Sequence, residues 1–228
     1  MIVDAPLFHG IPKTVLTAAT TRCVRRLCKY KDILFQEGQA AHSAFLLRSG
    51  LIKLIKSTPQ GRPVALEILT SGRLFGGMAV LDHRPYPASA FVLQESEILE
   101  IPGPVFEDLF NKVPEFAGAV HREIGQHFRH AQAMRALAQE PVERRVATLL
   151  LILLPNPKDE VRMRREDFAE LAGCIPETAI RILSDFKKRG LIRTGWKRIG
   201  LRNPAGLRAR AGIAAPAPTD PSYATLSS

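Results

Sequence analysis

Two charged residues four positions apart, Glu177 and Arg181, lie in the segment LAGCIPETAIRILSDFKKRGLI. An arginine guanidinium is a bidentate donor that matches the O6 and N7 atoms of guanine, and a glutamate accepts from the amino group of cytosine. At a spacing of four residues, both side chains project from one face of a helix. The pair therefore indicates a helix that reads base edges. An intrahelical salt bridge on a solvated face is the alternative.

The residues around this pair predict two short helices joined by a turn. The first covers 165–172, Gly173 permits the tight turn, and Pro176 suits the first position of a second helix that ends near Lys188. The outer face of the second helix carries Glu177, Thr178, Ile180, Arg181 and Ser184, and its buried stripe is Ala179, Ile182, Leu183 and Phe186. The following RGLIRTGWKRIGLRNP predicts a basic hairpin with Lys197 and Arg198 near its tip. Helix, turn, helix and hairpin make a winged helix-turn-helix.

Charge supports a polyanionic partner for this part of the chain. The 228 residues have a formal net charge of +10. Residues 141–210 hold 16 Lys and Arg against 8 Asp and Glu, whereas residues 1–140 hold 16 against 13. A basic C-terminal third points to double-stranded DNA.

The N-terminal part has the pattern of a small β-domain. Between residues 32 and 102, short apolar runs are interrupted by Gly and Pro, which predicts a sandwich or barrel of short strands. Residues 7–30 precede them as a helical segment. Residues 113–139 then form a long helix with an apolar seam in steps of four and three. This seam either packs on its own domain or joins two copies of the chain through Val120, Ile124, His127, Ala131 and Met134.

Several classes of protein are disfavoured by composition. Three cysteines make no disulfide framework, and no Cys/His set has zinc-finger spacing. The N-terminus lacks the pattern of a signal peptide, and the longest apolar run is too short for a bilayer, so no membrane partner and a cytoplasmic location are expected. Residues 211–228, rich in Pro, Ala and Ser, are predicted to be a disordered tail.

The chain resembles the CRP/FNR superfamily of bacterial transcription regulators over residues 7–210. The motifs that carry this resemblance are ILFQEGQ, FLLRSGLIKL, GRLFGGMAVLD and EDFAELAGCIPETAIRILSDFKKRGLI. The resemblance implies an α+β protein with a β-roll sensor domain (7–112), a dimerisation helix (113–139) and a winged helix-turn-helix DNA-binding domain (140–210). It also implies a homodimer that binds inverted half-sites and contacts RNA polymerase. We expect an activator without enzymatic activity, although the sequence leaves activation and repression both open.

The expected effector pocket departs from that of the cyclic-AMP-binding relatives. Those relatives have a Gly-Glu pair where this chain has Gly76 and Gly77, and an Arg followed by Ser or Thr where it has Tyr86 and Pro87. We place the pocket at Gly76, Gly77, Tyr86 and Ser89, and we expect no cyclic AMP binding. This departure resembles the FNR-like and nitric-oxide-responsive branches.

Other sensing chemistries remain open. Cys23 and Cys28 are too few for the N-terminal iron–sulfur cluster of the oxygen-sensing branch. Haem needs one or two ligands, and the sequence offers six histidines, of which His127 in the helical seam and His83 in the sensing loop are of most interest. Cys174, at a helix N-terminus, is either a packing residue or a redox switch. The remaining candidates for haem are His9, His42, His121 and His130.

The resemblance also leads to a DNA sequence. Relatives that read TGTGA half-sites carry an Arg where Pro176 stands, and Pro176 offers no donor. We therefore expect a TTGA half-site, with Arg181 on guanine, Glu177 on cytosine and Ile180 against a thymine methyl group. Two alternatives are a cyclic-nucleotide-type regulatory module that binds DNA non-specifically, and a cupin-like enzyme. The enzyme would need clustered metal ligands, but the only histidines in residues 32–102 are His42 and His83.

Overall fold

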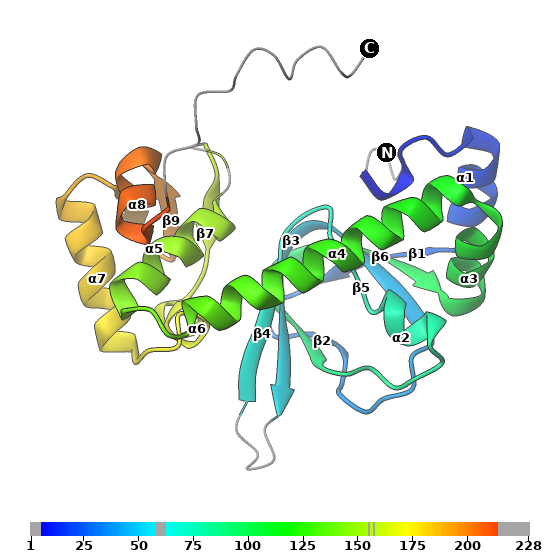
Figure 1. Ribbon diagram of the computed structural model, residues 1–228, viewed down its shortest axis with the longest axis horizontal. Helices are drawn as coiled ribbons and strands as arrows, with labels where there is room; N and C mark the ends of the chain where they lie inside the picture. The colour runs from blue at the N-terminus through cyan, green and yellow to red at the C-terminus, as the bar shows by residue number, and fades with distance from the viewer. Residues whose placement is uncertain (1–5, 58–62, 155, 157, 214–228) are drawn as a thin grey trace. The chain divides into compact units, whose positions relative to one another are not determined.

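A computed structural model describes residues 6–57, 63–154, 156 and 158–213. The chain forms two compact units, Met1–Arg135 and Ala136–Ser228 (Figure 1). Residues 214–228, most of the predicted disordered tail, lie outside the described residues. No helix within the described part of the chain combines the length and hydropathy that crossing a bilayer requires.

The first unit is built on one antiparallel sheet, which confirms the predicted β-roll. Its strands have the order β1-β6-β3-β4, with β2 paired to β6 and β5 paired to β3. The two apolar runs predicted at 88–94 and 96–102 form one continuous strand, β6. The strands are β1 (Val24–Cys28), β2 (Ile33–Phe35), β3 (Ser43–Ser57), β4 (Pro63–Leu69), β5 (Leu74–Phe75) and β6 (Ser89–Pro102).

Strand β1 corrects the expectation that residues 7–30 are helical throughout. The helical part ends with α1 (Lys13–Thr20), and residues 24–28 pair with β6. Arg25 and Arg26 form ion pairs of 2.9 and 3.0 Å with Glu97 and Glu100 on that strand. Such cross-strand pairs stabilise a strand in which Cys28 is the one buried residue.

The helices of the first unit are α1, α2 (Gly77–Leu81), α3 (Gly103–Lys112) and α4 (Pro114–Leu137). Figure 1 shows α1, α3 and the N-terminal half of α4 gathered at one end of the unit. A hydrophobic cluster joins them to the roll and includes Phe106 and Phe116, both fully buried. A second cluster inside the roll includes Phe35, Phe45 and Phe75.

The predicted helix at 113–139 is α4, but its apolar seam faces the roll of its own chain. Val120 is 1% exposed and belongs to the hydrophobic cluster that joins the helices to the roll. Ile124 packs against this cluster. The prediction that Val120 contacts a second copy is therefore wrong, because a side chain buried within one chain leaves no surface for a partner. His127 is also bonded within its own unit, whereas Ala131 is exposed. The side chain of Met134 lies outside the described residues.

The second unit is the predicted winged helix-turn-helix. A three-stranded sheet of order β7-β9-β8 is packed with four helices among the described residues. Strand β7 and helix α8 were not expected from the sequence. The elements are α5 (Val142–Leu153), β7 (Glu160–Arg162), α6 (Arg165–Leu171), α7 (Pro176–Lys188), β8 (Ile192–Gly195), β9 (Arg198–Leu201) and α8 (Pro204–Ala211).

Candidate functional site

The turn between α6 and α7 has the geometry that its sequence predicts. Gly173 adopts a φ of +62°, a left-handed conformation that favours glycine. The backbone N–H of Cys174 donates to the carbonyl of Ala169 at 2.9 Å, which closes the end of α6. Ile175 caps α7, and Pro176 stands at its start, where the missing N–H removes no helical bond. The turn therefore sets the start of the exposed helix.

Helix α7 separates an apolar face from a polar face. Ala179, Leu183 and Phe186 are buried, and Ile182, expected to be buried with them, is half-buried. The opposite face carries the five residues of the predicted outer face, of which four are exposed and one is half-buried. They are Glu177, Ile180, Arg181 and Ser184, with Thr178 half-buried beside them.

This outer face presents three kinds of recognition chemistry. Glu177, Ile180, Arg181 and Ser184 line one shallow hollow with Asp185 and Lys188. A guanidinium donor, a carboxylate acceptor and exposed methyl groups are the groups that distinguish base edges in the major groove. Ile180 is 49% exposed, so its methyl groups are available on this face.

The predicted wing is the hairpin of β8 and β9. Lys197 at its tip is exposed and has a φ of +52°. Arg198 is also exposed, but its guanidinium lies 3.5 Å from the carboxylate of Glu160 on β7. Trp196, which the sequence analysis did not single out, is 83% exposed, and the Lys197 ammonium lies 4.1 Å from the centroid of its ring. The sequence signal that could have identified Trp196 is its position as the chain's one Trp, directly after Gly195 in a basic turn.

Cys174 lies at the turn, but its surroundings do not activate the thiol. Burial raises the pKa of Cys174 above its ordinary value, and this outweighs the opposing effects of Arg145 and of the backbone N–H of Ala179. A reactive thiol needs a lowered pKa. The raised pKa gives no support to the redox switch, and both interpretations of Cys174 stay predictions.

At the place predicted for the effector pocket, the structure has a cavity of about 200 Å³ between the roll and α4. Three of the four predicted residues line it, namely Gly76, Gly77 and Tyr86. The fourth, Ser89, does not belong to the lining, because it lies at the start of β6 and its Oγ accepts a hydrogen bond from the backbone N–H of Glu37. The sequence analysis missed the aromatic wall and the residues that α4 contributes.

The glycine pair at the cavity is packed too tightly for the larger residue found in cyclic-AMP-binding relatives. Gly76 has a φ of +74°. A Cβ atom added to Gly77 would lie 2.7 Å from Cζ of Phe106, which is fully buried. A glutamate at this position would require Phe106 to move. The local packing therefore agrees with the expected absence of the ribose-binding carboxylate.

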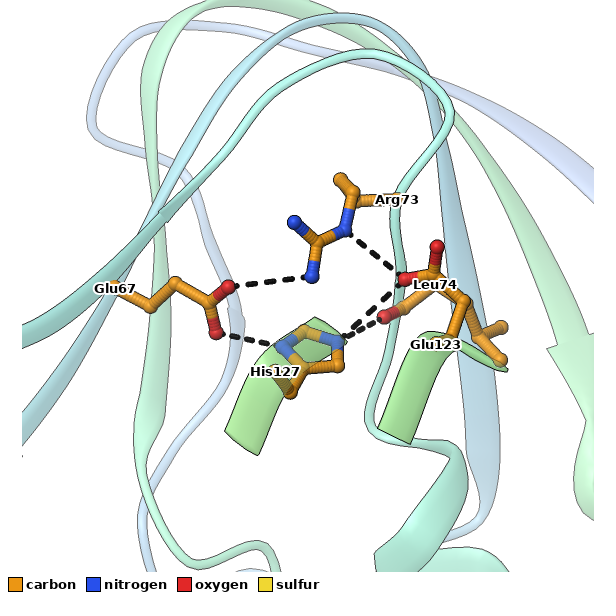
Figure 2. A network of polar contacts seen from close by, with 5 residues as sticks. All are labelled: Glu67, Arg73, Leu74, Glu123 and His127. Atoms are coloured by element: carbon orange, nitrogen blue, oxygen red, sulfur yellow. Dashed lines mark hydrogen bonds and ion pairs between the residues drawn. The ribbon is translucent and has the colours of Figure 1, made fainter. Parts of the chain in front are cut away.

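A polar network joins α4 to the roll beside the cavity, and three of its residues, Leu74, Glu123 and His127, line the cavity (Figure 2). His127 on α4 donates through Nδ1 to Glu67 at 2.6 Å and through Nε2 to the carbonyl of Leu74 at 2.8 Å. Arg73 contacts both carboxylates, with Nη2 3.4 Å from Glu67 and Nε 2.9 Å from Glu123. The network ties α4 to β4 and to the start of β5.

The two hydrogen bonds of His127 define its protonation state. A neutral imidazole has one N–H, whereas both acceptors here are oxygens, so both bonds require the imidazolium. Burial lowers the pKa of His127, but the hydrogen bond with Glu67, the charge of Glu67 and the Leu74 carbonyl together outweigh burial and the opposing charge of Arg73. The net pKa is raised above its ordinary value.

These bonds also bear on haem and metal ligation. Both ring nitrogens of His127 are occupied, so it could ligate iron only after breaking the network. His83 is 77% exposed and lies 3.7 Å from Glu107. Within the described residues, no group of three His, Cys, Asp or Glu is placed to hold a metal ion. Burial raises the pKa of Cys23 to about 11.

Comparison with known families accounts for both units. Residues 25–113 match the cyclic nucleotide-binding domain family, and residues 144–210 match the Crp-like helix-turn-helix domain family. The Cyclic AMP receptor protein of Thermus thermophilus is 29% identical over 203 residues, which cover 88% of this chain and 94% of that protein. The Fumarate and nitrate reduction regulatory protein of Vibrio cholerae is 29% identical over 189 residues, 79% of this chain and 75% of that protein.

The fold leads to the same family. A solved structure of a CRP-family transcriptional regulator from Thermus thermophilus has a TM-score of 0.68 and 25% identity, and the match covers 85% of this chain and 100% of that one. The present chain has a β-roll with a helical cover, then a long helix, then a winged helix-turn-helix. The chain belongs to the CRP/FNR family of transcription regulators.

Proposed function

We propose that this regulator binds an inverted-repeat operator as a homodimer and that α7 reads the bases. The observation that carries the proposal is the outer face of α7, where Glu177, Ile180 and Arg181 are exposed together. A helix of this kind in the major groove reads base edges with its N-terminal residues. The basic hairpin that follows it would supply phosphate contacts, which position the protein without selecting sequence.

The proposed half-site is TTGA. Arg181 would donate to guanine, Glu177 would accept from the amino group of a cytosine on the opposite strand, and Ile180 would contact a thymine methyl group. Pro176 has no N–H and no side-chain donor, so the outer guanine of a TGTGA half-site would go unread. Two half-sites about 10 base pairs apart, centre to centre, match one turn of B-DNA.

The proposed dimer keeps Ile124 and Ala131 of the predicted seam and adds Phe128 to them. Phe128 is 64% exposed, and Ala131 is exposed three positions later. Ile124, four positions before Phe128, is half-buried. Steps of four and three place these side chains on one face, as in a coiled-coil seam. An exposed Phe between two smaller apolar residues supports a second copy of α4 as its partner.

The resemblance extends the proposal to transcription itself. A dimer seated on an operator near a promoter would activate by contacting RNA polymerase, as the regulators of this family do. The proposal assigns DNA binding to the second unit, in which Lys and Arg outnumber Asp and Glu. A reporter gene behind an operator tests activation directly, since repression of the reporter would contradict it.

Selection of bound sequences from random DNA tests the reading by α7. We expect inverted TTGA repeats, and Arg181→Ala should weaken binding by about 1–3 kcal/mol and relax the preference at its guanine. Arg25→Ala removes the same charge from β1 in the first unit and serves as the matched control, with no change in the selected sequence. Recovery of TGTGA half-sites would contradict the Pro176 argument. Binding with no inverted repeat would favour the alternative of a regulatory module with non-specific DNA binding.

A further inference from the structure

The cavity beneath α4 has an aromatic wall and an apolar lining. Phe35, Phe75 and Tyr86 line it together with aliphatic residues from α2, β3 and α4. The ring of Tyr86 stacks on Phe35 with centroids 3.9 Å apart, and the centroids of Phe35 and Phe75 lie 6.1 Å apart. An apolar pocket with a few polar groups is the usual form of a small-molecule site.

Tyr86 contributes its ring but not its hydroxyl group. The hydroxyl donates to the carbonyl of Ser43 at 2.6 Å and accepts from the Ser43 N–H at 3.3 Å. Tyr86 is 3% exposed, so these bonds hold it in the wall of the roll. A ligand in the cavity would therefore find no free phenolic donor there.

The charged wall of the cavity is acidic. Glu123 lines the cavity, and its carboxylate can only accept hydrogen bonds when ionised. His127 also lines it, but its two N–H groups are used by Glu67 and Leu74 (Figure 2). Among the lining residues in the described part of the chain, none is Lys or Arg. A phosphate would thus meet the carboxylate of Glu123, while the two cations beside it, His127 and Arg73, are already paired with Glu67 and Glu123.

The volume restricts the size of the ligand. An apolar cavity of about 150 Å³ holds benzene. The cavity here, about 200 Å³, is larger than that by roughly the space of one substituent or fused ring. It suits one substituted or fused aromatic ring system and is too small for a porphyrin.

We propose that the cavity between the roll and α4 binds a compact, uncharged aromatic molecule whose single N–H or O–H donor is received by Glu123. This inference rests on the proposed function of a DNA-binding regulator and adds to it an effector that the first unit would sense. The ligand would touch Val120, Glu123 and Ile124 on α4, the helix that continues in the chain toward the second unit. Binding would thereby stabilise one arrangement of α4 against the roll.

Calorimetry with indole and indene tests the ligand class. The two probes have the same ring shape, but only indole has an N–H donor. We expect both to bind, with indole about tenfold tighter because its donor meets an ionised acceptor. Cyclic AMP should show no binding. Equal affinities for the two probes, or tighter binding of cyclic AMP, would overturn the proposal.

Two variants locate the site. Leu54→Trp places a larger side chain into the lining and should lower indole affinity at least tenfold, whereas Leu27→Trp, the same change on the exposed side of β1, should leave it unchanged. Glu123→Met removes the acceptor and should make the two probes bind equally. Circular dichroism confirms that each variant is folded. Unchanged affinity in a folded Leu54→Trp protein would overturn the assignment of the site.

Failure of this proposal is separable from failure of the proposed function. If the protein selects an inverted repeat but binds neither probe, the cavity proposal is wrong and the DNA reading stands. If the probes bind but no repeat is selected, the DNA reading is wrong and the cavity stands. The two experiments use different parts of the same full-length chain.

Discussion

Replacing His127 by Gln tests the polar network that joins α4 to the roll. The imidazolium of His127 donates to Glu67 and to the Leu74 carbonyl, and it supplies one of the two cations facing the carboxylates of Glu67 and Glu123. Arg73 supplies the other. A glutamine is neutral and cannot donate in both directions with this geometry, so the variant loses a charged hydrogen bond and leaves the network with an excess negative charge.

The magnitude follows from burial. The side chains of His127 and Glu67 are 27% and 11% exposed, so solvent screens their interaction only in part. A hydrogen bond to a charged group contributes about 1.5–3 kcal/mol. Because Arg73 still contacts Glu67 in the variant, we expect the free energy of local opening to fall by about 2 kcal/mol. This corresponds to roughly 30-fold faster hydrogen exchange through opening of the contact between α4 and the roll.

The effect should depend on pH with a definite sign. The folded-state pKa of His127 is raised above the ordinary value of 6.5. The imidazolium therefore stabilises the folded state fully below about pH 6.5, and this stabilisation is lost as pH rises through the higher folded-state pKa. The difference between wild type and His127→Gln should be largest at about pH 5.5 and should shrink by about pH 8.5.

Amide hydrogen exchange, corrected for intrinsic rates, measures the free energy of local opening in peptides that cover β5 and α4. His121→Gln is the matched control, because His121 is exposed on the same helix and bonds only to Ala117 of its own turn among the contacts described for it. The control should leave exchange in β5 unchanged. Equal effects of His127→Gln at both pH values would refute the reasoning, since they would show that His127 acts by packing and not by its charge.

Three further results are expected. Phe128→Glu should convert the dimer to a monomer of about 25.2 kDa by light scattering, and a dimer that survives would place the interface elsewhere. Lys197→Ala should lower the slope of log affinity against log salt by about 1 without changing the selected sequence, and Arg198→Ala should lower it less because Glu160 already pairs with Arg198. Gly77→Ala should cost about 1–3 kcal/mol in thermal unfolding because its Cβ meets Phe106; an unchanged stability would show that Phe106 has room to move.

The reading helix could be predicted from sequence because its signals are local. The buried stripe of Ala179, Leu183 and Phe186 has the helical period, and Gly173 and Pro176 mark the turn and the helix start within a few residues. Side chains at fixed spacing on one helix share a face whatever the rest of the chain does. Their DNA-binding roles stay a prediction.

The first unit shows where local pattern fails. Strand β1 carries Arg25 and Arg26, and its partners lie on β6, more than 70 residues away. The seam of α4 has the same four-three steps whether it faces a second copy or its own roll, so periodicity could not decide between them. The structure shows that Val120 faces its own roll, because the roll supplies a hydrophobic cluster that buries this side chain.

The sequence by itself determined the order of β-domain, long helix and winged helix-turn-helix, the basic charge of the second unit and the departure of Gly77 and Tyr86 from a nucleotide site. Only the tertiary structure decided what surrounds the effector cavity. Glu67 and His127 are 60 residues apart in the chain, yet they lie 2.6 Å apart once α4 packs on the roll. The reason is physical: helical period and turn residues act over a few positions, whereas the contents of a cavity depend on which distant elements pack together.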